Sequence, residues 1–186
     1  GQLILVLLGA ALLYGVLGGQ SPEIPLILTF VLAGALAGLL PFNFPRFTMF
    51  LGDVGSVPLG FSCGALMLWM GIQAQHEGLW FSLMPLIIYF FMEGSVTLLR
   101  RMWRREKWWQ PHREHFYQRL VRSGWSHTRT TGTIWGLQCV VTALACWQFR
   151  SGWSICLLWS AAVLVWGGFF LYAELEFRSR SQEVSN

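Results

Sequence analysis

The chain has 186 residues, of which 54% are apolar, 16% aromatic and 12% charged, with a formal net charge of +4. Soluble domains carry about 25% charged residues, so this composition excludes an ordinary soluble domain and predicts an integral membrane protein. We expect no nucleic-acid partner.

Six apolar segments follow one another along the chain, and most are near the ~20 residues that a helix needs to cross a bilayer. They span 3–18, 25–42, 55–73, 80–98, 132–149 and 153–173. This pattern predicts an all-α fold, a polytopic transmembrane helix bundle of about six helices forming a single membrane domain over 1–186. The chain starts at Gly1 with neither a basic stretch nor a cleavage site nearby, which argues against a signal peptide. We interpret it as the C-terminal part of a longer protein.

Basic residues gather in one segment and predict the orientation. Of 13 Lys and Arg residues, nine lie between Arg100 and Arg129. By the positive-inside rule, the loop at about 99–131 is cytoplasmic. Alternation of the spans places the loop at about 42–54 and a polar tail at 174–186 on the same side.

Asp53 is the only aspartate in the chain and lies between two apolar segments. A carboxylate at the edge of the hydrocarbon is costly and usually faces a cavity, a cation or a partner charge. Gly52 and Gly55 allow a sharp turn around it, and Ser56 adds an oxygen donor. One carboxylate with substrate phosphates and water is a normal environment for magnesium. Alternatively, Asp53 caps a helix that begins near Val54; the local sequence leaves both interpretations open.

The basic loop carries His112 and His115 among several guanidinium groups. Their spacing permits a metal site, but a cationic neighbourhood favours anion recognition. Arg113 and Arg119 are suited to hold phosphate oxygens in a bidentate fork while a histidine donates one more hydrogen bond. The alternative is that the loop only sets topology and attracts anionic lipid.

Glu93 lies about seven residues, or roughly 10 Å by helical rise, inside the cytoplasmic end of its span. An unpaired carboxylate is expensive at this depth, so we expect it to face the bundle interior, toward a cation or a hydrogen-bonding partner. We interpret His76, Glu77 and His127 as solvated turn residues.

Two motifs resemble those of the polyprenyl-phosphate N-acetylhexosamine-1-phosphate transferases, a glycosyltransferase family 4 superfamily. Its Asn, Pro and Phe-Met-Gly-Asp-x-Gly-Ser pattern corresponds to Asn43, Pro45 and the segment from Phe50 to Ser56, with Leu51 in place of Met. Glu93 followed by Arg100-Arg101 is also similar to the family pattern.

The basic loop departs from the family. Many members carry His-x-His-His before a Gly-aromatic pair, whereas here the first position is His115 and the other two are Tyr117 and Gln118. The segment from Pro111 to Leu120 resembles a variant found in Gram-negative surface-polysaccharide enzymes.

The resemblance implies that a polyprenyl (undecaprenyl) phosphate attacks the β-phosphorus of a UDP-N-acetylhexosamine and releases UMP, in O-antigen-like envelope synthesis. It implies Asp53 and His115 as catalytic residues and Asp53 as the ligand of Mg²⁺, or of Mn²⁺ in its place. Substrate would be bound by Asn43, Glu93, Arg113, Tyr117 and Gln118. The expected location is the bacterial inner membrane with cytoplasmic site loops, and the assembly could be a homodimer.

A second departure from the family pattern is the absence of one of its motifs. The family's Asp-Asp pair has no counterpart in a chain with one aspartate, so the resemblance covers the C-terminal half, which we expect to be inactive alone. The rival hypothesis is a non-catalytic six-helix scaffold or transporter, in which Glu93 lines a pathway and the basic loop binds lipid headgroups. A transporter has no reason to combine the Asn43/Asp53 spacing with the 111–120 motif.

Overall fold

The structure is a computed structural model. It describes residues 1–17, 24–45, 52–74, 78–106 and 115–185, and the side chains of Asp53 and of residues 181–185 lie outside that description. All elements of the described residues are helical, which confirms the predicted all-α class.

In the described parts of the chain, eight α-helices and three segments of π- or 3₁₀-helix follow one another. In order they are α1 (Gln2–Ala11), a π-helix (Leu12–Leu17), α2 (Ile24–Leu39), a 3₁₀ helix (Leu40–Phe42), α3 (Gly52–Gln73), α4 (Gly78–Leu83), a 3₁₀ helix (Met84–Ile87), α5 (Ile88–Trp103), α6 (Phe116–Arg122), α7 (His127–Ser151) and α8 (Ile155–Ser185).

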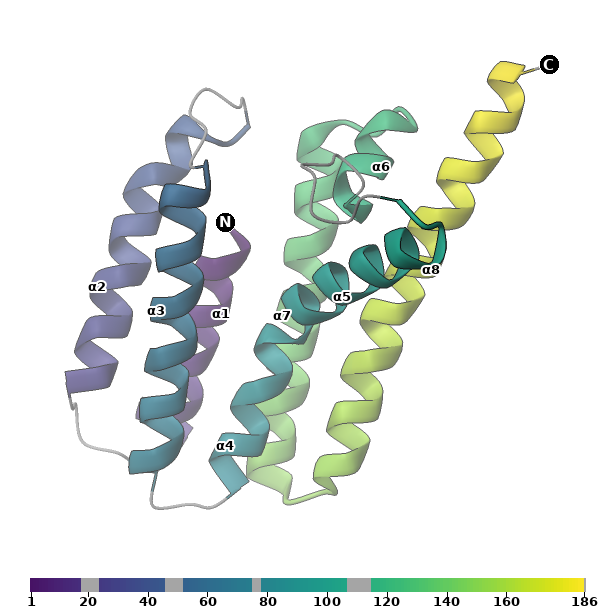
Figure 1. The fold of residues 1–186 in the computed structure, drawn as a ribbon. Coiled ribbons are helices and arrows are strands. Elements are labelled where there is room, and N and C mark those ends of the chain that lie inside the picture. Colours follow the sequence, from purple (N-terminus) through teal and green to yellow (C-terminus); the bar gives the residue numbers. More distant parts are fainter. Residues whose placement is uncertain (18–23, 46–51, 75–77, 107–114, 186) are drawn as a thin grey trace.

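The long helices run up and down alternately, so that the end of α2 and the starts of α1, α3 and α7 all lie at one end of the bundle (Figure 1). Four segments of the described residues are long and apolar enough to cross a membrane: Ile24–Phe42, Val54–Gln73, Gly78–Trp103 and Ile155–Arg180. The first helix is apolar but shorter, and α7 is 25 residues long but carries more polar side chains. The predicted number of about six spans is therefore approximate.

One predicted span, 80–98, is broken into two helices. Pro85 lies in the 3₁₀ segment between α4 and α5, where its missing N–H removes a helical hydrogen bond. Figure 1 shows α5 continuing at a different angle from α4, toward α8. The break brings Glu93 and the basic end of α5 to the end of the bundle where α6 lies.

Two apolar clusters hold the bundle together. The first joins α1, α3, α4 and α8 through side chains such as Leu7, Met67, Leu83 and Leu158. The second is rich in aromatic rings and joins α5, α6, α7 and α8. In this cluster the rings of Tyr89 and Trp166 lie 4.6 Å apart between centroids, and those of Phe116 and Phe170 lie 4.5 Å apart. The aromatic cluster therefore packs against the buried face of α6 through Phe116.

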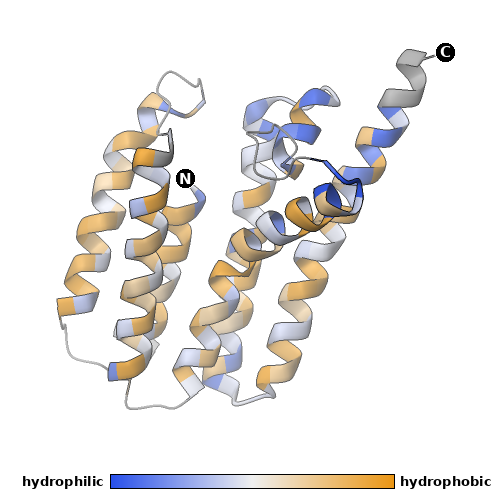
Figure 2. Ribbon diagram, in the orientation of Figure 1, coloured by the Kyte–Doolittle hydropathy of each residue, from blue (hydrophilic) through white to orange (hydrophobic). Residues whose placement is uncertain are grey.

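The polar segment expected as a tail after residue 173 continues α8 as helix to Ser185. Figure 2 shows hydrophilic residues on this part of α8, on α6 and at the end of α5. Glu174 lies in this polar region rather than in a separate tail.

Candidate functional site

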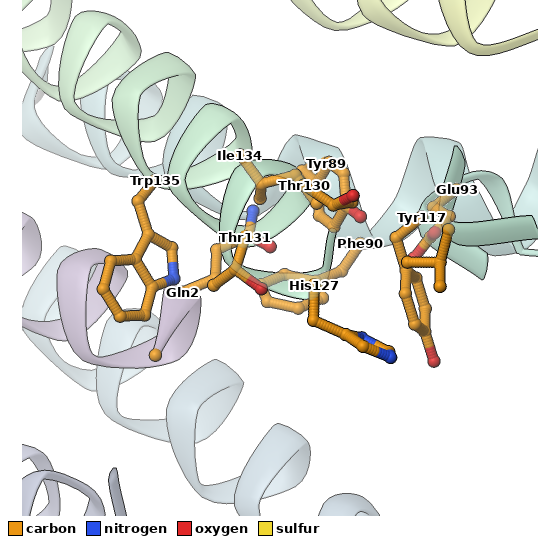
Figure 3. Close-up of a pocket in the computed structure, with 12 residues that line it drawn as sticks. Gln2, Tyr89, Phe90, Glu93, Tyr117, His127, Thr130, Thr131, Ile134 and Trp135 are labelled. Carbon is orange, nitrogen blue, oxygen red and sulfur yellow. The ribbon is translucent and has the colours of Figure 1, made fainter. Parts of the chain in front are cut away.

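A pocket of about 240 Å³ opens at the end of the bundle where α6 and α7 begin. Its walls come from α1, α5, α6 and α7, including Gln2, Tyr89, Glu93 and Tyr117 (Figure 3). The Gln2 side chain donates to Gln138 of α7 at 3.3 Å, which holds the start of α1 beside that wall.

One face of α7 forms much of the pocket wall. The hydroxyl of Ser126 accepts a hydrogen bond from the backbone N–H of Arg129 at 3.1 Å and so caps the helix. The lining residues then follow at the i, i+3, i+4, i+7 and i+8 positions of a helical face: His127, Thr130, Thr131, Ile134 and Trp135. His127 is exposed, as expected of a solvated residue, but it lines this pocket instead of lying in an isolated turn.

Glu93 connects the membrane helix α5 with the first turn of α6. Its side chain is buried, with 8% of the residue exposed, and one carboxyl oxygen lies 3.9 Å from Nδ1 of His115. Tyr89 of the same helix and Tyr117 of α6 line the pocket together with Glu93. The other oxygen, Oε1, has no hydrogen-bond partner among the described residues. Glu93 thus faces the interior, as expected of an acidic residue at this depth.

Two predicted residues of the basic loop, His115 and Tyr117, lie beside that carboxyl. His115 precedes α6, and its ring stacks on that of Tyr117 with 5.9 Å between centroids. The amide of Gln118 donates to the Tyr117 hydroxyl at 3.1 Å, although Gln118 itself does not line the pocket. Burial raises the pKa of Tyr117, so its hydroxyl stays protonated at neutral pH and can donate a hydrogen bond.

The opposite face of α6 is fixed by ion pairs to α8. Glu174 binds Arg119 of α6, Arg100 of α5 at 3.0 Å and Arg178 of its own helix at 2.8 Å. A helix of seven residues is marginal on its own, so its position depends on these contacts and on the burial of Phe116. The arginines face α8, while Tyr117 and Val121 face the pocket.

Comparison with known proteins identifies the family. Residues 1–71 match the family model described as glycosyl transferase family 4. A phospho-N-acetylmuramoyl-pentapeptide-transferase from Levilactobacillus brevis is 31% identical over 138 residues, which cover 71% of this chain and 39% of that protein. The chain belongs to glycosyl transferase family 4.

Two further relatives of this family 4 chain act on polyprenyl phosphates by name. A decaprenyl-phosphate N-acetylglucosaminephosphotransferase from Mycolicibacterium smegmatis is 29% identical over 122 residues, 60% of this chain and 30% of that protein. A probable undecaprenyl-phosphate N-acetylglucosaminyl 1-phosphate transferase from Bacillus subtilis is 29% identical over 112 residues, 59% of this chain and 31% of that protein. No solved structure matches the chain.

The family 4 chain thus spans less than two fifths of the length of these relatives. Its apolar helices and its family make it a multi-pass membrane protein. The residues that match the family model include Asn43 and Asp53, whereas most of the pocket wall comes from later helices.

Asn43 is followed by a residue that contacts the pocket wall. Its amide donates to the Leu39 carbonyl at 3.3 Å, and the ring of the next residue, Phe44, lies 5.0 Å from that of Trp135 in the pocket wall. The segment that carries Asn43 therefore contacts Trp135 of the pocket wall in this family 4 chain, although neither Asn43 nor Phe44 lines the cavity.

The remaining predicted residues are only partly described. Helix α3 begins at Gly52, so Asp53 lies in its first turn instead of preceding a helix at Val54, and its side chain is outside the description. Arg113 and His112 also lie outside the described residues.

Within the described residues, no group of three or more His, Cys, Asp or Glu side chains could hold a metal ion. Magnesium usually takes one or two carboxylates together with substrate phosphates and water, so a lone Asp53 fits the donor set that this ion uses.

Sequence reasoning missed the wall of α7. Thr130, Thr131 and Trp135 carried no recognised motif, and each is common on membrane helices. The usable signal was the cap at Ser126 followed by polar residues at helical spacing in the first two turns of an otherwise apolar segment.

Proposed function

We propose that this chain forms part of an enzyme that transfers an N-acetylhexosamine-1-phosphate from a UDP-sugar to a polyprenyl (undecaprenyl) phosphate. A phosphate oxygen of the lipid attacks the β-phosphorus of the sugar nucleotide, the bond between the β-phosphorus and the bridging oxygen breaks, and UMP leaves. The product would enter cell-envelope polysaccharide synthesis of the O-antigen type, at the inner membrane, with the site facing the cytoplasm.

The observation that carries this proposal is the meeting of two distant segments. The segments with Asn43 and with α6 carry residues that the family resemblance selects; Tyr117 of α6 lines the pocket, and Phe44, next to Asn43, contacts Trp135 of its wall. The relatives named as polyprenyl-phosphate transferases support the same chemistry.

Each predicted site residue is assigned to a part of the substrate or to the metal ion according to its charge and hydrogen-bonding groups. We assign the diphosphate of the sugar nucleotide to Arg113 and His115, whose N–H groups can donate to phosphate oxygens. Asn43 would position the diphosphate, and Tyr117 and Gln118 would contribute neutral donors. We assign Mg²⁺, or Mn²⁺ in its place, to Asp53; when bound, the ion would neutralise phosphate charge.

The chain covers only part of its relatives, so we assign the activity to the complete protein and expect these 186 residues alone to be inactive. We propose that an Asp-Asp pair elsewhere in the complete protein completes the site.

The test is the substitution Asp53→Asn in the protein as its gene encodes it. UMP release from UDP-N-acetylhexosamines in the presence of undecaprenyl phosphate should fall by at least about 100-fold, the loss typical of removing one electrostatic stabiliser. Membrane insertion should be unchanged, because only one charge is removed.

Glu176→Gln provides the matched control, because it removes a carboxylate charge from the far part of α8, where Glu176 pairs with Arg180 at 3.7 Å. This variant should keep full activity. Normal UMP release by Asp53→Asn at ordinary magnesium would overturn the assignment of Asp53. An unaltered protein that releases UMP from no UDP-sugar yet binds anionic vesicles would favour the scaffold.

A further inference from the structure

The pocket wall mixes aromatic, aliphatic and polar side chains. Among the described residues that line it, none is Lys or Arg, and the one carboxylate is Glu93. Arg119 of α6 and Arg100 of α5 pair with Glu174 of α8 instead of lining the pocket. None of the described lining residues therefore offers a guanidinium or ammonium side chain to a phosphate. The pocket is therefore suited to a neutral polar group, and the phosphates belong at its rim.

A buried acceptor in the wall lacks its hydrogen bond. Oε1 of Glu93 is buried and has no hydrogen-bond partner among the described residues, while the other oxygen, Oε2, lies 3.9 Å from Nδ1 of His115. Buried polar groups are nearly always hydrogen-bonded, and an exception calls for a missing donor. A ligand hydroxyl or amide N–H in the pocket would supply that donor.

The size and walls of the pocket restrict the ligand further. Its volume of about 240 Å³ is below the ~300–1,000 Å³ of sites for drug-sized molecules, which suits a single ring with short substituents rather than a whole nucleotide. Figure 3 shows Trp135 at one end, Glu93 and Tyr117 at the other, and Thr131 and His127 between them. Aromatic faces with hydroxyl and imidazole groups between them match a ring that is apolar on its faces and polar at its edge.

We propose that this pocket holds the N-acetylhexosamine ring of the sugar nucleotide, and that the face of α7 with His127, Thr131 and Trp135 determines which sugar is accepted. This inference rests on the proposed function and adds that the pocket binds the sugar ring of the substrate. Oε1 of Glu93 accepts from a ring hydroxyl or from the acetamido N–H. The hydroxyl of Thr131 contacts a polar group at the ring edge.

The experiment is Thr131→Val in the protein as its gene encodes it, which removes one hydroxyl at nearly constant size. UMP release is measured with UDP-N-acetylglucosamine, UDP-N-acetylgalactosamine and the UDP derivative of N-acetylfucosamine. The ratio of kcat/KM between the best and second-best sugar should change by about 10-fold or more, because a site that hydrogen-bonds a ring hydroxyl discriminates strongly. His127→Gln should also change the ratio, in the same assay.

Thr133→Val is the matched control. Thr133 is on the same helix but does not line the pocket, and its hydroxyl bonds to the Arg129 carbonyl at 2.9 Å. This variant should leave the ratio between sugars unchanged. If Thr131→Val and Thr133→Val give the same ratio as the unaltered protein, the sugar assignment is wrong while the proposed function stands.

A second measurement separates the sugar from the uracil ring, which is also flat, neutral and polar. Inhibition by UMP should be the same in Thr131→Val and in the unaltered protein if the pocket holds the sugar. An equal loss of affinity for UMP and for every UDP-sugar would instead place the nucleobase in the pocket and overturn the inference. Failure of the unaltered protein to release UMP from any UDP-sugar would overturn both the inference and the proposed function.

Discussion

Two buried carboxylates hold the short helix α6 in opposite ways. The side chains of Glu93 and Glu174 are similarly buried, 11% and 13% exposed, and each lies on a helix that could cross the membrane. Glu174 is paired with three arginines from three helices. The ion pair described for Glu93 is the long one to His115, and one of its oxygens has no hydrogen-bond partner among the described residues.

The difference separates a carboxylate that stabilises the fold from one that is available to a ligand. Each of the three arginines occupies hydrogen-bond acceptor sites of the Glu174 carboxylate, so a substrate would have to displace a charged partner to bind there. Glu93 has spare acceptor capacity and lines a pocket, so a donor can bind without displacing anything. Burial alone would have ranked the two residues equally.

The sharpest test of this contrast is Glu174→Gln. It removes the Glu174 carboxylate from the nearly buried Arg119 and the half-buried Arg100, and breaking a buried ion pair from one side typically costs about 3 kcal/mol. Thermal unfolding in detergent should show the loss. Adding Arg119→Leu to this variant should restore part of it, because the buried guanidinium that had paired with Glu174 is then also removed. Unchanged unfolding in Glu174→Gln would mean that the cluster does not hold α6.

The corresponding substitution at Glu93 should reduce enzymatic activity more than stability. Glu93→Gln keeps the shape of the side chain and one acceptor oxygen and leaves no buried guanidinium behind, so its effect on unfolding should be smaller than that of Glu174→Gln. Hydrogen bonds to a charged group are worth about 1.5–3 kcal/mol, so kcat/KM for UMP release should fall about 10- to 100-fold. A variant with full activity and reduced stability would reverse the roles assigned to the two carboxylates.

The smallest expected effect is that of Arg178→Gln. Arg178 also pairs with Glu174, but its side chain is 69% exposed and the pair lies within one helix. Exposed pairs of this kind contribute about 0.3–0.5 kcal/mol, so unfolding should barely change. A loss as large as that of Glu174→Gln would show that the number of arginines matters more than their burial.

The sequence predicted those features that depend on local composition. The runs of apolar residues indicated the helices, and the cost of a charge in lipid indicated that Glu93 faces inward. Pro85 marked the break between α4 and α5, but within an uninterrupted apolar segment it gave no angle and so no hint that α5 turns toward α8.

The cluster around Glu174 could not be predicted in this way. Its key pair joins residues 119 and 174, which are 55 positions apart, and single-sequence patterns carry no information about such contacts. The same holds for the ring contact of Phe44 with Trp135, which brings the Asn43 segment to the pocket. Asp53 and Arg113 remain predictions, because the side chain of the first and the whole of the second lie outside the described residues.

The length of α8 has a consequence for the position of α6. Glu174 lies about 28 Å along this 31-residue helix from Ile155, by the 1.5 Å rise per residue, which is close to the ~30 Å thickness of the hydrocarbon layer. The arginine cluster therefore lies at the level where α8 leaves the lipid tails and enters the headgroups. Since Arg119 ties α6 to this point, the length of α8 sets the distance between α6 and the opposite end of the bundle.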